Sequence, residues 1–212
     1  MNPVIGIDFD NTIINYEDVF YDTALRKSLI SADTPKNKKL IRDRIRSMAN
    51  GEEHWMRLQA DVYGSGISEA RINDGVSDFF YLCKANNIMT YVVSHKTQFA
   101  KYDEEGFDLR NASLKWMETN HFFDAQGINL SPDNVFFEST RLEKIQTIRN
   151  LGCTHFIDDL EEVFRECSFP EGVIKMVYSP TKIMTPASMD WRVFTHWQEI
   201  TEYFFGSENA RK

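Results

Sequence analysis

The sequence predicts an α/β protein in which a Rossmann-like parallel β-sheet is covered by helices on both faces. Short apolar runs alternate along the chain with segments of helical periodicity, which is the pattern of strand–helix–strand units. Several of these runs end at an acidic or hydroxyl-bearing residue. The first two runs lie roughly eighty residues apart, far more than a crossover connection needs, so an inserted segment is also predicted.

Five apolar runs are expected to be strands of this sheet. Their apolar residues are continuous rather than alternating, and this suits strands that are buried on both faces. The runs are Val4–Ile7 and the segments 89–93, 135–137, 155–157 and 173–177.

Helices are expected between these strands. Apolar residues at helical spacing predict a helix over 76–83 and another that begins after Asp108, both packed on the sheet. The capping-box pair Thr140 and Glu143 predicts the start of a helix that runs through Asn150, with Gly152 ending the segment. A second such pair, Thr195 and Gln198, predicts a helix through residue 205.

The long interval between the first two strands is expected to form a small α-helical cap. It carries three apolar stripes at helical spacing, over 21–29, 41–48 and 55–62, which need a core of their own. The predicted domains are therefore an α/β core, residues 1–15 and 73–212, and a helical cap, residues 16–72.

Composition excludes several classes of protein. With a net charge of −8 and a pI of about 5.2, the chain would be repelled by nucleic-acid backbones. It has no apolar run of a length that could cross a membrane, and no signal-peptide pattern. Its three cysteines form no CxxC pair, so neither a disulfide framework nor a zinc site is expected. We therefore expect a cytoplasmic protein that binds neither nucleic acid nor membrane; the sequence does not indicate its oligomeric state.

Acidic, hydroxyl and basic residues follow the predicted strands, where ligands bind in an open parallel sheet. In chain order they are Asp8, Asp10, Asn11, Thr12, Ser94, His95, Lys144, Asp158 and Asp159. Several carboxylates at neighbouring strand ends repel one another unless a cation lies among them, and oxygen ligands of this kind favour Mg²⁺. A carboxylate beside the metal can attack phosphorus, and a second one can transfer the proton.

The order DxDxT, then Ser, then Lys, then Asp-Asp resembles the four motifs of the haloacid dehalogenase (HAD) superfamily. The motifs here are Asp8 to Thr12, Ser94, Lys144, and Asp158 with Asp159. The resemblance extends from Ile5 to about Phe164, apart from the insertion, which resembles the helical cap of the family's first structural subclass.

The resemblance implies a role for each motif residue. Catalysis would depend on Asp8 as nucleophile, Asp10 as general acid and base, and Lys144 as the cation that neutralises phosphoryl oxygens. The phosphoryl group would be bound by Thr12 and Ser94 and by backbone N–H groups near Asn11 and His95. The Mg²⁺ ligands would be Asp8, Asp158, the backbone carbonyl of Asp10, and Asp159 directly or through water.

The implied function is a Mg²⁺-dependent phosphomonoester hydrolase that acts through an aspartyl-phosphate on a small metabolite. The resemblance implies that Asp10 favours a phosphatase or a phosphomutase, because dehalogenase and phosphonatase members of the family lack an acid at that position. The stretch 156–164 resembles HAD hydrolases of bacterial surface-polysaccharide regions, which implies a sugar phosphate or a polysaccharide precursor as substrate. The alternatives are a phosphomutase of the same fold and a non-catalytic regulatory module.

Overall fold

The computed structural model describes residues 2–103, 106–181 and 190–206, and the chain divides into two compact units. The first unit comprises Met1–Ile14, Ile72–His95 and His121–Lys212, and the second comprises Asn15–Arg71 and Lys96–Asn120. The segment Lys96–Asn120 thus groups with the inserted residues, whereas it was predicted as part of the α/β core.

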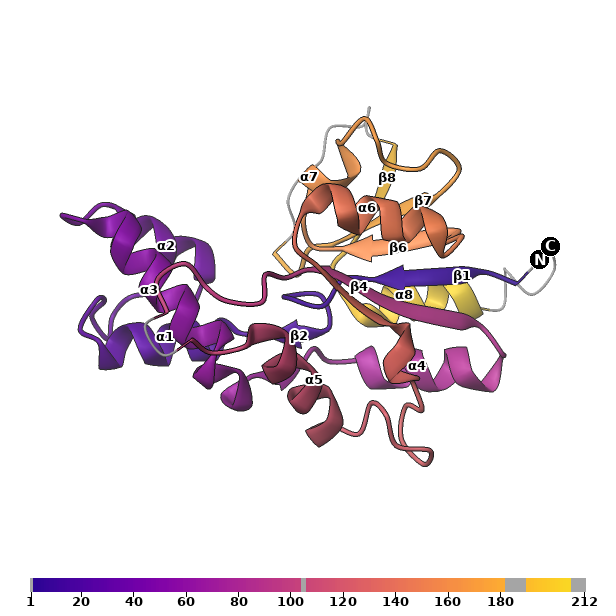
Figure 1. The fold of residues 1–212 in the computed structure, drawn as a ribbon, viewed down its shortest axis with the longest axis horizontal. Coiled ribbons are helices and arrows are strands. Elements are labelled where there is room, and N and C mark those ends of the chain that lie inside the picture. Colours follow the sequence, from indigo (N-terminus) through magenta and orange to yellow (C-terminus); the bar gives the residue numbers. More distant parts are fainter. Residues whose placement is uncertain (1, 104–105, 182–189, 207–212) are drawn as a thin grey trace. The chain divides into compact units, whose positions relative to one another are not determined.

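The first unit contains a six-stranded parallel sheet, with the strand order β5-β4-β1-β6-β7-β8 (Figure 1). The strands are β1 (Val4–Ile7), β4 (Met89–His95), β5 (Val135–Glu138), β6 (His155–Asp158), β7 (Ile174–Tyr178) and β8 (Trp191–Phe194). The predicted α/β fold class is confirmed, and so are the five predicted strands, with small shifts at their ends.

The sixth strand, β8, was not predicted. It lies at the edge of the sheet, beside β7, and only Phe194 of its four residues is buried. Its sequence is interrupted by a charged residue, Arg192, so it lacks the continuous apolar run by which the inner strands were recognised.

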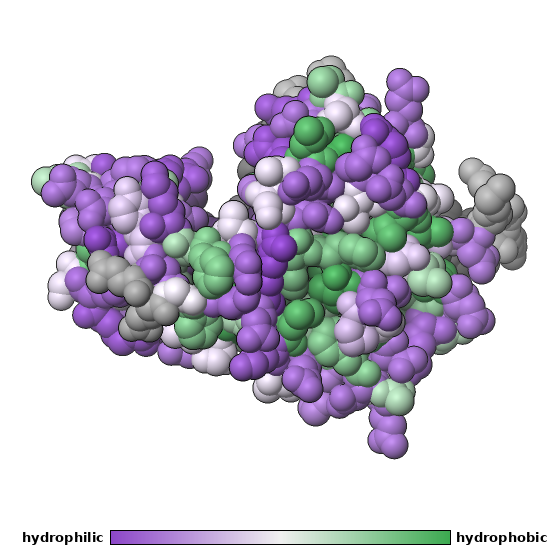
Figure 2. Space-filling view, in the orientation of Figure 1, coloured by the Kyte–Doolittle hydropathy of each residue, from purple (hydrophilic) through white to green (hydrophobic). Residues whose placement is uncertain are grey.

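Helices cover both faces of the sheet (Figure 1). α4 (Val76–Ala85) and α8 (Trp197–Phe205) lie on one face, where the rings of Phe79 and Trp197 are 5.2 Å apart. α6 (Arg141–Asn150) and α7 (Glu161–Phe164) lie on the other, and their buried side chains join those of the sheet in one apolar cluster. On the molecular face drawn in Figure 2, hydrophilic residues cover much of each unit, and hydrophobic residues form a patch on the first unit.

The helix α6 begins and ends as its sequence predicts. The Thr140 hydroxyl accepts a hydrogen bond from Glu143 N–H at 3.1 Å, and the Glu143 carboxylate accepts one from Thr140 N–H at 3.0 Å. The chain leaves the helix at Gly152, whose φ of 65° is one that glycine adopts readily.

The start of α8 differs from the prediction. The capping pair was expected to be Thr195 and Gln198, but the carboxylate of Glu199 accepts from Thr195 N–H at 2.6 Å and from His196 N–H at 3.4 Å. The predicted pair is wrong because the ionised carboxylate, one residue further along, is the stronger acceptor for these N–H groups. The helix itself then runs Trp197–Phe205, close to its predicted range.

The second unit is helical. Its elements are α1 (Glu17–Arg26), α2 (Lys38–Arg46), α3 (Gly51–Tyr63), the 3-10 helix η1 (Ser65–Glu69) and α5 (Leu109–Thr119). Two short strands, β2 (Ile14–Asn15) and β3 (Arg71–Ile72), pair where the chain leaves and re-enters the first unit. Phe20 of α1 stacks on Trp55 of α3 with ring centroids 5.2 Å apart, so the inserted helices share an aromatic core.

The helix predicted after Asp108 is α5, and it groups with the second unit. Asp108 caps it, as predicted, accepting a hydrogen bond from Asn111 N–H at 2.9 Å. There the indole of Trp116 donates to the Ala70 carbonyl at 2.9 Å. Among the described residues of both units, no helix is long and apolar enough to cross a bilayer.

His155, on β6, should make the stability of the protein depend on pH. Burial, with a further contribution from Arg192, lowers the pKa of this imidazole to about 4. Between this value and the usual value near 6.5, the unfolded chain binds more protons than the folded one, so stability falls as the pH falls through that interval. The ring is only half-buried, so we expect it to lower the free energy of unfolding by about 1–2 kcal/mol over this interval.

A His155→Phe variant keeps an aromatic ring next to Phe204, whose centroid lies 4.8 Å from that of the imidazole. Free energies of unfolding measured between pH 7 and pH 4 should fall less steeply for this variant than for the wild type. Identical slopes would show that His155 does not carry this pH dependence.

Candidate active site

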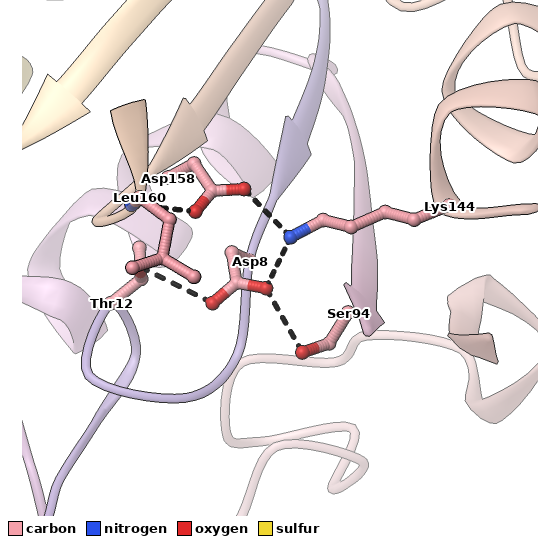
Figure 3. A network of polar contacts seen from close by, with 6 residues as sticks. All are labelled: Asp8, Thr12, Ser94, Lys144, Asp158 and Leu160. Carbon is pink, nitrogen blue, oxygen red and sulfur yellow. Dashed lines mark hydrogen bonds and ion pairs between the residues drawn. The ribbon is translucent and has the colours of Figure 1, made fainter. Parts of the chain in front are cut away.

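Four polar side chains meet in a buried cluster where the central strands of the sheet end (Figure 3). Asp8 directly follows β1, Ser94 lies near the end of β4, and Asp158 ends β6. These strands are neighbours and run parallel, so their carboxyl ends lie at the same edge of the sheet. Lys144 reaches the cluster from near the start of α6.

The ammonium of Lys144 lies between two carboxylates (Figure 3). Its Nζ donates a hydrogen bond of 2.6 Å to Oδ1 of Asp8 and another of 2.6 Å to Oδ2 of Asp158. All three side chains are buried, so solvent screens these interactions little. Lys144 therefore links the strand end that carries Asp8 to the strand end that carries Asp158.

Hydroxyl groups hold the Asp8 carboxylate from other directions. Ser94 Oγ donates to Oδ1 of Asp8 at 2.9 Å, and Thr12 Oγ1 lies 3.5 Å from Oδ2. Asp158 is held by the N–H of Leu160, which donates to its Oδ1 at 2.9 Å. The carboxylate of Asp8 thus has a defined orientation, with Oδ1 more strongly engaged than Oδ2.

Burial dominates the electrostatics of this cluster. It raises the pKa of Asp8 to about 6; the Lys144 ammonium opposes this rise, and the carboxylates of Asp158 and Asp10 add to it. Burial by itself would lower the pKa of Lys144, but the attraction of Asp158 and Asp8 outweighs it, so that pKa is raised and the side chain is a cation.

Three carboxylates in the described residues could hold a metal ion. Oxygen atoms of Asp8, Asp158 and Asp159 lie within 4.8 Å of one another. The Lys144 ammonium contacts Asp8 and Asp158, and a cation bound among the three carboxylates would relieve their mutual repulsion further. Hard oxygen ligands at this spacing suit Mg²⁺, so the residues present fit such an ion.

Three other predicted residues lie nearby. Asp10 is half-buried and close enough to raise the pKa of Asp8, although its side chain is not part of the three-carboxylate group. Asn11 has a φ of 62°. The imidazole Nε2 of His95 lies 3.0 Å from the Ser139 carbonyl, so its side chain is tied to the turn before α6. The predicted phosphate contacts of Asn11 and His95 concern backbone N–H groups and stay predictions.

Two residues beside the site were not predicted to contribute to it. Asn73 and Trp197 are buried and donate hydrogen bonds to carbonyls of the loop that follows Asp8. The sequence shows Asn73 only as part of an Asn-Asp-Gly turn, and Trp197 only as an apolar residue of a helix. Neither pattern indicates which distant backbone group the side chain will meet.

No family model and no curated protein matches this sequence. Many solved structures match its fold. A HAD-superfamily hydrolase of subfamily IA from Geobacter sulfurreducens is 14% identical, with a TM-score of 0.56 and a match covering 96% of each chain. A predicted phosphoglycolate phosphatase from Haemophilus somnus is 12% identical, with a TM-score of 0.57 and a match covering 95% of this chain and 97% of that one.

A third match is CbbY from Rhodobacter sphaeroides, a mutant in complex with xylulose-1,5-bisphosphate. It is 12% identical, with a TM-score of 0.54, and the match covers 94% of this chain and 96% of that one. These likenesses extend over nearly the whole of each chain, so they include the helical insertion as well as the sheet.

The chain therefore has an α/β fold with a polar site at the carboxyl edge of its sheet. More specifically, this fold is that of the HAD-superfamily hydrolases, and the fold that the sequence motifs predicted is confirmed.

Proposed function

We propose that this protein is a HAD-superfamily phosphatase, which hydrolyses phosphomonoesters with Mg²⁺ and forms an aspartyl-phosphate on Asp8. The observation that supports this most strongly is the buried contact of Lys144 with both Asp8 and Asp158, at 2.6 Å each. A buried ammonium between two carboxylates costs desolvation that an apolar core would avoid. Such an arrangement suits a site that stabilises negative charge on a transferring phosphoryl group.

The reaction would proceed in two displacements. An oxygen of the Asp8 carboxylate attacks phosphorus, the bond to the ester oxygen breaks, and Asp10 donates a proton to the departing alcohol. Asp10 then takes a proton from a water molecule, which attacks the aspartyl-phosphate and releases inorganic phosphate. Ser94, Thr12 and Lys144 would bind the phosphoryl oxygens throughout, since their donor groups already surround Asp8.

The Mg²⁺ site in this proposal consists of Asp8, Asp158 and Asp159, with the backbone carbonyl of Asp10 as a further ligand. When bound, Mg²⁺ would supply positive charge to phosphoryl oxygens and to the carboxylates that hold it. Lys144 would neutralise the side of Asp8 that it already contacts.

The substrate in this proposal is a small phosphorylated metabolite of the sugar-phosphate kind, including precursors of polysaccharides, and the protein would act in the cytoplasm. One structurally similar protein was crystallised with a sugar bisphosphate, and another is described as a predicted phosphoglycolate phosphatase. Both names refer to those proteins, and they indicate which compounds to test first.

Removal of divalent metal should abolish the activity. Phosphate release is measured across a panel of phosphorylated sugars and organic acids, with Mg²⁺ and with excess chelator. We expect release with Mg²⁺, a loss of at least about a hundredfold with chelator, and recovery when Mg²⁺ is restored. Full activity in excess chelator would contradict the proposed role of the three carboxylates, and an isomerised phosphate ester without phosphate release would indicate a phosphomutase.

A further inference from the structure

The loop that follows Asp8 is held by side chains from two distant parts of the first unit. Nδ2 of Asn73 donates to the carbonyl of Thr12 at 2.9 Å and to that of Asn11 at 3.2 Å. The indole Nε1 of Trp197 donates to the same Thr12 carbonyl at 3.1 Å. The backbone N–H of Asn73 donates to the Ile13 carbonyl at 2.8 Å. Three successive carbonyls of the loop therefore have fixed partners.

The two hydrogen bonds to the Thr12 carbonyl are buried, and the bond to the Asn11 carbonyl is partly buried. Thr12 and Trp197 are 0% exposed and Asn73 is 6% exposed. The two donors come from separate elements, since Asn73 directly follows β3 and Trp197 begins α8. Buried hydrogen bonds are costly to break because the freed carbonyl has no water to replace the lost donor, so the loop has little freedom to reorient.

Because the carbonyls of the loop are held, the directions of its N–H groups are fixed as well. In a trans peptide the C=O and the N–H of the following residue point in opposite directions. Because Asn73 binds the Asn11 carbonyl, the N–H of Thr12 points away from Asn73. The peptide between Thr12 and Ile13 shows the same relation. The Thr12 carbonyl accepts from Trp197, and the N–H of Ile13 donates to the Phe9 carbonyl at 3.0 Å.

Within the described parts of the chain the N–H of Thr12 donates to no other residue, although Thr12 is fully buried. The hydroxyl of the same residue is directed at the Asp8 carboxylate (Figure 3). Both donor groups of Thr12 thus depend on how the loop is oriented.

Two backbone features indicate that this arrangement is built into the fold. Asn11 has a left-handed φ of 62°, a conformation that asparagine adopts more readily than most residues and that sets the direction of the loop here. Gly75 has a φ of 88°, and a Cβ there would lie 2.9 Å from Cβ of Trp197, so a side chain at this position would displace the indole. Glycine therefore permits the close approach of Trp197 to the loop.

We propose that Asn73 and Trp197 are positioning residues for the phosphatase reaction. They orient the loop so that the hydroxyl and the N–H of Thr12 face the phosphoryl group transferred to Asp8. This inference depends on the proposed function, because it assigns the two residues to the same site. In this proposal α8 contributes to catalysis through Trp197, without any contact with the substrate.

Trp197→Phe tests the proposal with little loss of packing. Phenylalanine keeps a ring beside Phe79 but removes the N–H that Thr12 accepts. We expect kcat to fall about tenfold while KM stays within about twofold, since misplaced catalytic groups lower kcat strongly. Asn73→Ala, which removes the donor to two carbonyls, should lower kcat by about a hundredfold. Ile200→Val, a fully buried change on the same helix, is the matched control and should leave kcat within about twofold.

The measurement is the kcat and KM of the full-length protein with Mg²⁺, well below each variant's melting temperature, on the best substrate of the phosphate-release panel. Hydrogen exchange of the peptide over residues 9–15 is followed in parallel and should be faster in Trp197→Phe than in Ile200→Val.

The possible outcomes separate the two proposals. Wild-type protein that releases no phosphate from any member of the panel overturns the proposed function and this inference with it. An active wild type whose Trp197→Phe variant keeps its kcat overturns the inference alone, even if Asn73→Ala does not fold. An equal loss of kcat in Ile200→Val would also overturn it, because the loss would then come from the packing of α8.

Discussion

An Asp8→Asn variant should lose phosphatase turnover while keeping its fold. An amide is a poor nucleophile, so we expect kcat to fall by more than about 10⁴-fold, which is typical when a covalent nucleophile is removed. The fold should tolerate the change, because burial raises the pKa of Asp8 from 3.8 to about 6, so at pH 7 the folded protein bears the cost of an ionised carboxylate in a buried place. An uncharged amide of the same shape avoids this cost, so the melting temperature of the metal-free variant at pH 7 should not fall.

Phosphate release and thermal unfolding are measured on the same preparation. Asp133→Asn, at an exposed position of the short 3-10 helix η2 (Pro132–Asn134), is the matched control and should change neither quantity. Normal turnover in Asp8→Asn would show that water attacks the substrate directly or that the nucleophile lies elsewhere. A collapse of the melting temperature would show that Asp8 is needed for folding, contrary to the sign of its pKa shift.

Replacing Lys144 by methionine should have the second largest effect. Methionine keeps much of the apolar stem but removes the ammonium that contacts Asp8 and Asp158. Those two carboxylates would then face each other without a fixed cation, and the phosphoryl oxygens would lose a charged donor. We expect kcat to fall by about 10²- to 10³-fold, the range seen when one electrostatic stabiliser is removed.

The Lys144→Met variant should also be less stable than the wild type. Removing one member of a buried ionic network typically costs about 3–5 kcal/mol, so Lys144→Met should unfold at a lower temperature and its activity should be measured well below that point. Arg149→Met, at an exposed position of the same helix, controls for the loss of a basic residue from α6. If Lys144→Met keeps the wild-type kcat, the ammonium has no part in the chemistry.

The arrangement of the site could be predicted from the sequence because its residues lie at the ends of predicted strands. Asp8, Ser94 and Asp158 each stand at the end of an apolar run, and adjacent parallel strands bring their carboxyl ends to one edge. Lys144 could be placed because a capping box that begins at Thr140 fixes where its helix starts. These are local sequence patterns, and a parallel sheet is enough to bring the residues they mark together at one edge.

Other features depend on contacts between distant segments. The apolar stripe of α5 shows that this helix packs against another part of the chain, but not that its partners include η1 and the chain around Ala70. The hydrogen bonds of Asn73 and Trp197 to the Asp8 loop join positions that no periodicity relates. β8 was not predicted because an edge strand needs no continuous apolar run.

The most direct test of the proposed mechanism is to trap the phosphoenzyme. Wild-type and Asp10→Asn proteins are mixed with Mg²⁺ and the best substrate of the panel, quenched in acid and treated with borohydride, which reduces an acyl phosphate to homoserine. Peptide mass spectrometry then locates the reduced residue. We predict homoserine at position 8, in higher yield in Asp10→Asn, since that variant lacks the base that activates water. Reduction at another residue, or none in either protein during active turnover, would contradict the assignment of Asp8 as the nucleophile.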